Sequence, residues 1–152
     1  MPKVGEPAPD FTLINQDGRT VHLSDYRGKR VVMFAYPAAG TSGCTTQACG
    51  FRDQFPKFEQ NKIVVLGISP DKPEDQLKWK QKEGLQYDLL CDMDHKVLAQ
   101  WGAWGDKTSY GKTYQGVIRS HWIIDENGIV VDEQLNVKPV ESVERAVKAF
   151  GW

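Results

Sequence analysis

The chain lacks long hydrophobic runs and any surplus of charge of one sign. Its longest apolar runs, residues 31–36 and 63–68, are too short to cross a bilayer. The net charge of -1 gives no electrostatic reason to expect a nucleic-acid partner. Residues 1–7 have no apolar core of the kind found in secretory signals. We therefore expect no membrane and no nucleic-acid partner, and a cytoplasmic location, with the nucleus or an organelle as alternatives.

Cysteine is also scarce, with 3 residues in 152. A small, odd number cannot build a disulfide scaffold, which leaves catalysis, metal binding or core packing as roles. Cys44 and Cys49 are separated by four residues, and none of the 3 histidines lies at ligand spacing to another candidate, so the possible ligands are scattered. We therefore expect no bound metal.

What the chain does contain is an alternation of strand-like and helix-like segments. Continuous apolar stretches predict buried strands, and turns at 15–18 and 125–128 predict two hairpins. The expected strands are residues 11–13, 21–23, 31–36, 63–68, 87–91, 117–124 and 129–133, and the expected helices are residues 45–59, the segment after 74, 94–101 and 140–150. The glycine- and aromatic-rich residues 102–116 are expected to form a loop. This order predicts one α/β domain, residues 1–152, with a mixed, mostly parallel central sheet flanked by helices and preceded by an N-terminal β-hairpin, in a thioredoxin-like layout.

Cys44 lies where the strand 31–36 gives way to a helix. Beyond it, Phe51, Phe55 and Phe58 recur at helical spacing, which places the cysteine at the amino end of that helix. Free backbone N–H groups and the positive end of the helix dipole stabilise an anion there and favour the reactive thiolate. We interpret Cys44 as a nucleophile.

Two further side chains are expected beside this sulfur. A tight turn could direct the Thr41 hydroxyl to it, although Thr41 taken alone suits a plain helix N-cap better. Arg119 lies in the apolar segment 117–124, where an unpaired charge is costly, so we expect it to meet the thiolate and a polar substrate. The alternative is an edge-strand arginine facing water. His121 shares the face of Arg119 by strand alternation and is interpreted as structural.

The second cysteine, Cys49, follows Cys44 on the same predicted helix. On a regular helix their Cα atoms are about 8–9 Å apart, whereas a disulfide needs about 7 Å or less. A bond between them therefore requires local unwinding, and the Cys-x-x-Cys spacing of a static redox pair is absent. Without Cys44, an inert buried thiol would be preferred for Cys49. Cys91, at the end of an apolar strand, is expected to be inert.

These residues together resemble a known family. The pattern Pro37-x-x-x-Thr41-x-x-Cys44 is similar to the active-site signature of peroxiredoxins. Residues 43–53 resemble the PrxQ (bacterioferritin comigratory protein) subfamily. The likeness extends over nearly the whole chain, through residues 67–69, 89–92, 104–107, 111–114 and Arg119.

The resemblance implies that Cys44 is the peroxidatic cysteine and Cys49 the resolving one, with Pro37, Thr41 and Arg119 completing the site. It implies a thioredoxin-like fold, hydroperoxide substrates and reduction by thioredoxin, and it favours a monomer. The expected reaction forms a sulfenic acid on Cys44, then a Cys44–Cys49 disulfide. No cofactor is needed, because sulfur itself passes through the oxidation states.

Three positions depart from many relatives. Ser42 stands where proline is common, which leaves the preceding loop less stiff. Gln47 stands where glutamate is common, so a carboxylate close to the nucleophile is missing. Cys91 replaces what is often a serine, which weakens any case for its taking part.

Two other functions fit parts of the sequence. A general thiol–disulfide oxidoreductase would reduce disulfides without peroxide, and a non-catalytic thioredoxin-fold binding or holdase module would have incidental cysteines. The cysteine spacing argues against the first, and an arginine beside a helix-start thiol argues against the second. The aromatic residues of the expected loop could form an apolar wall for bulky peroxides, together with one tryptophan just before the loop, although they equally suit core cover. The loop residues are Trp104, Tyr110 and Tyr114, and the preceding one is Trp101.

Overall fold

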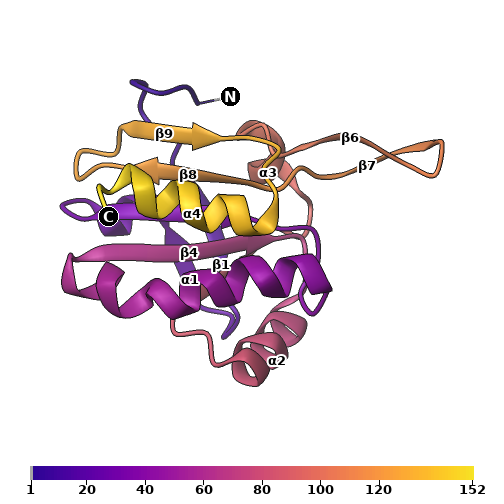
Figure 1. Cartoon of the computed structure of the whole chain (residues 1–152), viewed down its shortest axis with the longest axis horizontal. Coiled ribbons are helices and arrows are strands. Elements are labelled where there is room, and N and C mark those ends of the chain that lie inside the picture. The colour runs from indigo at the N-terminus through magenta and orange to yellow at the C-terminus, as the bar shows by residue number, and fades with distance from the viewer. Residues whose placement is uncertain (1) are drawn as a thin grey trace.

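The computed structural model describes residues 2–152, which contain a seven-stranded mixed sheet with helices packed on its faces (Figure 1). The strands of this sheet, in the order β2-β1-β5-β4-β3-β8-β9, are β1 (Thr12–Ile14), β2 (Thr20–His22), β3 (Arg30–Ala35), β4 (Ile63–Ser69), β5 (Asp88–Cys91), β8 (Ser120–Ile124) and β9 (Val130–Gln134). The helices are η1 (Leu23–Tyr26), α1 (Ser42–Gln60), α2 (Pro73–Glu83), α3 (Lys96–Gln100) and α4 (Pro139–Ala149).

Strand β3 lies inside the sheet, between β4 and β8. It pairs in parallel with β4 and antiparallel with β8, while β4 pairs in parallel with β5. The N-terminal hairpin joins β1 to β2, with Leu13 opposite Val21, and β1 then extends the sheet beyond β5. The predicted mixed sheet and N-terminal hairpin are confirmed.

The sheet separates two apolar clusters, because successive strand side chains point to opposite faces. On β3, Val31 and Met33 belong to the cluster that also holds Trp101 and Trp122. Val32 and Phe34 belong to the other, which includes Cys44 and the buried faces of α1, α2 and α4. Figure 1 shows α1 and α4 side by side over this second face. The nucleophile candidate is therefore attached to the main aromatic core.

The expected loop at 102–116 is wrong, because these residues form an antiparallel ribbon. It consists of β6 (Trp104–Ser109) and β7 (Lys112–Val117), and it projects from the body of the molecule (Figure 1). Tyr110 and Gly111 turn the chain with positive φ values of 52° and 76°. Most of β7 is exposed, so the ribbon carries no apolar alternation that would predict strands.

Two boundaries also differ from those expected. The segment 117–124 is not one strand: β7 ends at Val117 and β8 begins at Ser120. Arg119 thus lies in a two-residue break, with its carbonyl accepting a hydrogen bond from the Val137 N–H at 2.9 Å. Helix α1 begins at Ser42, earlier than the expected Thr45, so Cys44 is inside its first turn.

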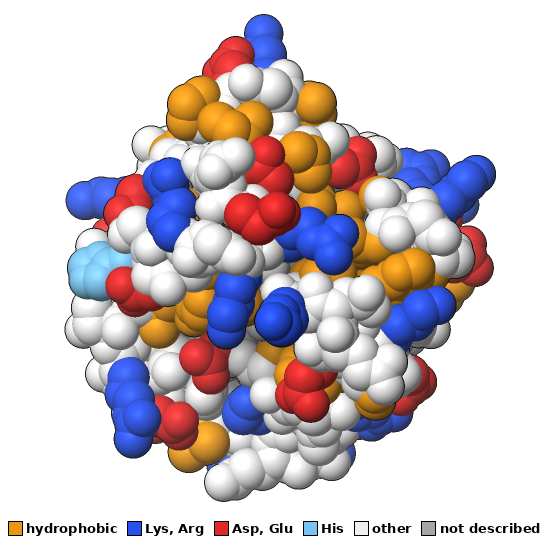
Figure 2. Space-filling view, turned by 90° about the vertical axis from the view of Figure 1, so that its left-hand side faces the viewer, with side chains coloured by type: hydrophobic (Ala, Val, Ile, Leu, Met, Phe, Trp, Pro, Cys, Tyr) orange, Lys and Arg blue, Asp and Glu red, His pale blue; other side chains and the backbone are white. Residues whose placement is uncertain are grey.

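Charged side chains of both signs are interspersed on the face drawn in Figure 2, in keeping with the net charge of -1. Among residues 2–152, no helix combines the length and the apolar character needed to cross a membrane.

Candidate active site

The first turn of α1 carries Cys44 as its third residue. Thr41 occupies the N-cap position in extended conformation, and the Thr45 N–H donates to its carbonyl at 2.9 Å. The Cys44 side chain is 1% exposed. A thiolate here would be held at the positive end of a helix dipole and largely out of water, where charge interactions are strong.

Arg119 makes the closest charged contact with this sulfur. Its Nη2 donates to Cys44 Sγ at 3.5 Å, and its Nη1 donates to Gln47 Oε1 at 2.7 Å. A Cβ on Gly43 would lie 3.1 Å from Arg119 Nη2, so the absent side chain leaves the guanidinium room. One planar group therefore spans the sulfur and a helix side chain, which fixes its orientation.

A buried chain of hydrogen bonds holds Gln47, the side chain to which Arg119 donates. Gln47 Nε2 donates to Ser142 Oγ at 3.0 Å, and Ser142 Oγ lies 2.8 Å from His121 Nδ1. All three side chains are fully buried. Ser142 accepts from Gln47 and has one hydroxyl proton, which it donates to His121 Nδ1. The ring proton of His121 is then at Nε2, which faces Asp132 Oδ2 at 3.7 Å without a hydrogen bond. His121 thus acts on the site only through Ser142 and Gln47.

Thr41 and Pro37 flank the sulfur without contacting it through a hydrogen bond. The Thr41 hydroxyl donates to the Ala38 carbonyl at 2.7 Å rather than to Cys44. Pro37 lines a cleft of about 520 Å³ together with Arg119, Lys107 and Pro139. Partial burial and the neighbouring Arg119 guanidinium lower the pKa of Lys107, and Cys44 acts in the opposite sense. The cleft is large enough to admit an organic hydroperoxide to the arginine.

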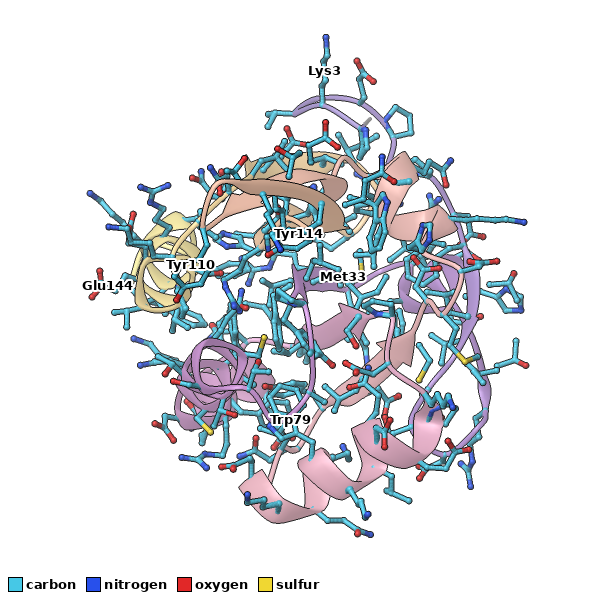
Figure 3. The ribbon with its side chains drawn as sticks, turned by 90° about the vertical axis from the view of Figure 1, so that its right-hand side faces the viewer. Lys3, Met33, Trp79, Tyr110, Tyr114 and Glu144 are labelled. Carbon is cyan, nitrogen blue, oxygen red and sulfur yellow. The ribbon has the colours of Figure 1, made fainter. Side chains whose placement is uncertain are left out.

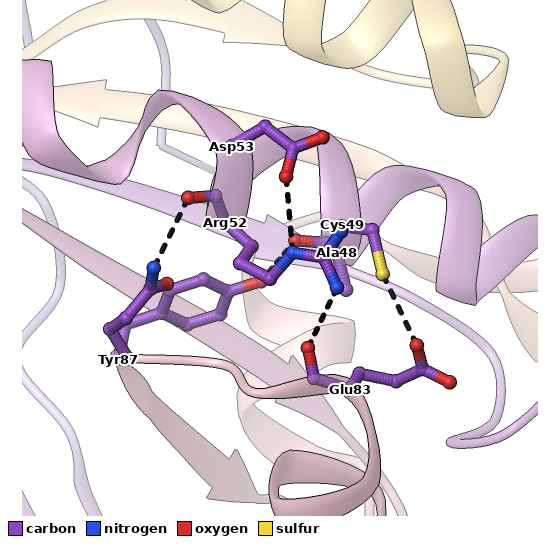
Figure 4. A network of polar contacts seen from close by, with 7 residues as sticks. Ala48, Cys49, Arg52, Asp53, Glu83 and Tyr87 are labelled. Carbon is purple, nitrogen blue, oxygen red and sulfur yellow. Dashed lines mark hydrogen bonds and ion pairs between the residues drawn. The ribbon is translucent and has the colours of Figure 1, made fainter.

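Cys49 lies five residues further along α1, about 1.4 turns, and is not among the residues that line this cleft. Its Sγ donates to Glu83 Oε2 at 3.5 Å (Figure 4). Burial raises the pKa of Cys49; the Arg52 guanidinium opposes this shift, and the hydrogen bond to Glu83 adds to it. Both cysteines are free, and both lie on the regular helix α1. The estimated Cα separation of about 8–9 Å therefore applies, and α1 as folded keeps them apart.

The aromatic residues of 101–114 do not wall the cleft. Trp101 is fully buried in the core, and Trp104 stacks on His95 at 3.8 Å between ring centroids. Tyr110 and Tyr114, labelled in Figure 3, lie on the ribbon, and Tyr110 is fully exposed at its tip. The residues that line the cleft include none of these four.

Cys91 is a third free thiol, buried at the end of β5. Burial, followed by the negative charge of Asp71, raises the pKa of Cys91 to about 12. At pH 8 only about one thiol in 10⁴ is then ionised, so Cys91 should resist iodoacetamide in the native protein and react after denaturation. Peptide mass spectrometry of the alkylated chain measures this, and rapid native labelling of Cys91 would contradict it.

No group of three or more His, Cys, Asp or Glu side chains in the described part of the chain could hold a metal ion. The groups that the structure brings together at the site are the Cys44 thiol, the Arg119 guanidinium and the Gln47 amide.

Comparison with known proteins decides the family. Residues 4–133 match the AhpC/TSA family. The chain belongs to this family. A peroxiredoxin of Mycobacterium tuberculosis is 51% identical over 141 residues, covering 93% of this chain and 90% of the relative. The peroxiredoxin Bcp of Escherichia coli is 48% identical over 126 residues, covering 83% and 81%.

A solved structure agrees with these relatives. The Xanthomonas campestris bacterioferritin comigratory protein, described for its alkyl peroxide reduction activity, superposes with a TM-score of 0.86 at 26% identity, covering 91% of this chain and 88% of that one. The chain is thus a peroxiredoxin of the Bcp/PrxQ type with a thioredoxin-like fold, and its activity is that of a thiol peroxidase. The resemblance read from its motifs is confirmed.

Sequence reasoning missed several residues of the candidate site of this peroxiredoxin. It noted Gln47 as a departure but not as the hydrogen-bond partner of Arg119, and it did not single out Ser142, Lys107 or Glu83. Glu83 lies 34 residues from Cys49, and Ser142 lies 95 residues from Gln47. The one available signal was that buried polar side chains require partners.

Proposed function

We propose that this peroxiredoxin reduces hydrogen peroxide and organic hydroperoxides with Cys44 as the peroxidatic residue. The observation that carries the proposal is the Arg119 Nη2 group 3.5 Å from a buried sulfur in the first turn of α1. A cation and helix-terminal N–H groups at this point attract both the thiolate and the charge that develops on the peroxide.

In the first step, the Cys44 thiolate attacks one oxygen of the hydroperoxide. A sulfur–oxygen bond forms, the O–O bond breaks, and the leaving alkoxide or hydroxide takes a proton to become alcohol or water. Cys44 is left as a sulfenic acid. Arg119 is the donor best placed to stabilise charge moving along the O–O bond. Pro37 and Thr41 would limit the directions from which the peroxide can approach Cys44. The Thr41 hydroxyl would have to break its hydrogen bond to the Ala38 carbonyl before it could bind the substrate.

In the second step, Cys49 resolves the sulfenic acid. Its sulfur attacks the Cys44 sulfur, an S–S bond forms, the S–O bond breaks, and water leaves with the thiol proton. This requires the turn of α1 between the two cysteines to unwind. An external dithiol then exchanges with the disulfide and restores both thiols.

Thioredoxin is the reductant that we propose, with the protein acting as a cytoplasmic monomer. The activity described for the Xanthomonas campestris relative supports alkyl hydroperoxides as substrates. The decisive experiment is loss of NADPH in a mixture of this chain, thioredoxin, thioredoxin reductase and hydrogen peroxide or cumene hydroperoxide. Turnover without peroxide, on a disulfide substrate, would instead favour a thiol–disulfide oxidoreductase.

Replacing Cys49 with serine separates the two steps. Cys49→Ser should still consume about one equivalent of peroxide, because Cys44 and Arg119 are intact, but thioredoxin-dependent turnover should fall by about 100-fold or more. At one equivalent of peroxide, intact-mass spectrometry should show Cys44 as a sulfenic acid without a disulfide; a sulfinic acid forms only when a second equivalent is supplied. Cys91→Ser is the matched control and should turn over normally. Full turnover of Cys49→Ser would exclude Cys49 as the resolving residue.

A further inference from the structure

The segment of α1 that separates the two reactive cysteines is bound along its length by one neighbouring stretch of chain. From residues 79–87, Trp79 Nε1 donates to Thr45 Oγ1 at 3.2 Å, and the Tyr87 hydroxyl donates to the Ala48 carbonyl at 2.6 Å. Cys49 donates to Glu83 at 3.5 Å. All three contacts fall within residues 45–49, the turn that has to unwind.

Arg52, in the next turn of α1, is hydrogen-bonded to the same neighbouring stretch of chain. Its Nη1 donates to the Glu83 carbonyl at 2.8 Å, and its own carbonyl accepts from Gln86 Nε2 at 3.3 Å (Figure 4). Helix α2 ends at Glu83 because Gly84 adopts the left-handed conformation, with φ 64°. The guanidinium therefore caps the negative end of the α2 dipole, which is a favourable position for a cation.

Each of these contacts exists only while α1 is folded. When Cys49 moves to Cys44, its hydrogen bond to Glu83 is broken. When the backbone of this turn unwinds, the Ala48 carbonyl moves and loses its hydrogen bond from Tyr87. Free energy from the contacts is thus lost when the turn opens, so they slow opening. A slow opening leaves the sulfenic acid exposed to a second peroxide, which oxidises it irreversibly to sulfinic acid.

We propose that Trp79, Glu83 and Tyr87 form a clamp that sets the rate of disulfide formation, and that Glu83 is the positioning residue that holds the Cys49 thiol away from Cys44. The inference rests on the proposed roles of the two cysteines. It assigns a control of resolution, and thereby of sensitivity to overoxidation, to residues that do not touch peroxide.

Oxidation of Cys44 and formation of the disulfide can be measured separately. The reduced protein is mixed with peroxide, the reaction is quenched at intervals, and the mass of the intact protein is measured by mass spectrometry. In Glu83→Ala and in Tyr87→Phe, conversion of sulfenic acid to disulfide should quicken by about three- to tenfold, since each change removes one hydrogen bond from the closed state. The first oxidation of Cys44 should change by less than about twofold, because the hydrogen bond to the Cys44 sulfur comes from Arg119 and from neither of these side chains. The sulfinic fraction at excess peroxide should fall correspondingly. Glu59→Ala, which removes an exposed carboxylate from the last turn of α1, is the matched control and should resolve at the original rate.

The proposal requires faster resolution in both variants, and any other result overturns it. Slower resolution in Glu83→Ala would instead make Glu83 a base that activates Cys49. If the unmodified chain forms no sulfenic acid on Cys44, the proposed function fails, and that failure is visible in the first step alone.

A further measurement isolates the contact between Glu83 and the thiol. In a Cys44→Ser background, the pH profile of Cys49 alkylation should move to lower pH in Glu83→Gln, because the carboxylate helps to keep the pKa of Cys49 high. Arg52, Asp53 and Tyr87, the other titratable groups facing this thiol, are unchanged in that variant. An unshifted profile would overturn the assignment of Glu83.

Discussion

Replacing Cys44 with serine is expected to lower peroxidase turnover by about 10⁴-fold or more, to the background of the assay. A serine hydroxyl is not ionised at neutral pH and is a far weaker nucleophile towards the O–O bond, even with Arg119 in place. The side chains are similar in size, and the buried site should keep its packing. NADPH consumption with thioredoxin and thioredoxin reductase measures the effect.

The control for this substitution is Cys91→Ser, which alters another buried thiol and should retain turnover. Circular dichroism of both variants establishes that they fold. Peroxide reduction that persisted in Cys44→Ser at more than a few per cent would mean that a different group carries the reaction, and the proposed site would have to be abandoned.

Replacing Arg119 with methionine is expected to have the second largest effect, slowing the first oxidation of Cys44 by about 10²- to 10³-fold. That is the usual consequence of removing one donor aimed at charge that develops in a transition state. Arg119→Lys should recover only part of the rate, because a single ammonium cannot reach Cys44 Sγ and Gln47 Oε1 together. Rapid-quench mass spectrometry under pseudo-first-order peroxide gives the rate directly.

Lys138→Met is the matched control for Arg119. Lys138 is an exposed cation that lines the same cleft, so its removal changes the charge of the cleft without removing the donor to sulfur. It should change the rate by less than about threefold, because exposed charges act weakly through water. Equal losses in Lys138→Met and Arg119→Met would show that the general charge of the cleft matters, rather than the contact with Cys44.

Much of the framework could be predicted because it depends on short-range patterns. The continuous apolar runs of β3 and β4 and the turn residues of the N-terminal hairpin predicted the mixed sheet correctly. The strand-to-helix junction also placed Cys44 at a helix start, where the structure has it within the first turn of α1. These features are set by the backbone and by side chains within a few residues of one another.

The polar arrangement around the sulfur could not be predicted in the same way. Arg119 was expected within a strand, yet it occupies a break between β7 and β8, and the ribbon β6–β7 was expected as a loop. The partner of Arg119 is Gln47, which is held by Ser142 from α4. The Thr41 hydroxyl turned to the Ala38 carbonyl instead of the sulfur. Each contact depends on how distant elements dock.

Local chemistry was therefore enough to establish the fold class, the nucleophile candidate and the need to unwind α1 before its two cysteines can join. The contact between Arg119 and Cys44 was itself expected, but what holds the guanidinium and what restrains Cys49 were settled by the packing of α4 and α2 against α1. The physical reason is one of range. Periodicity and helix geometry act over neighbouring residues, whereas Arg119 and Glu83 reach the cysteines from 75 and 34 residues away, through the order of the strands and the docking of the helices.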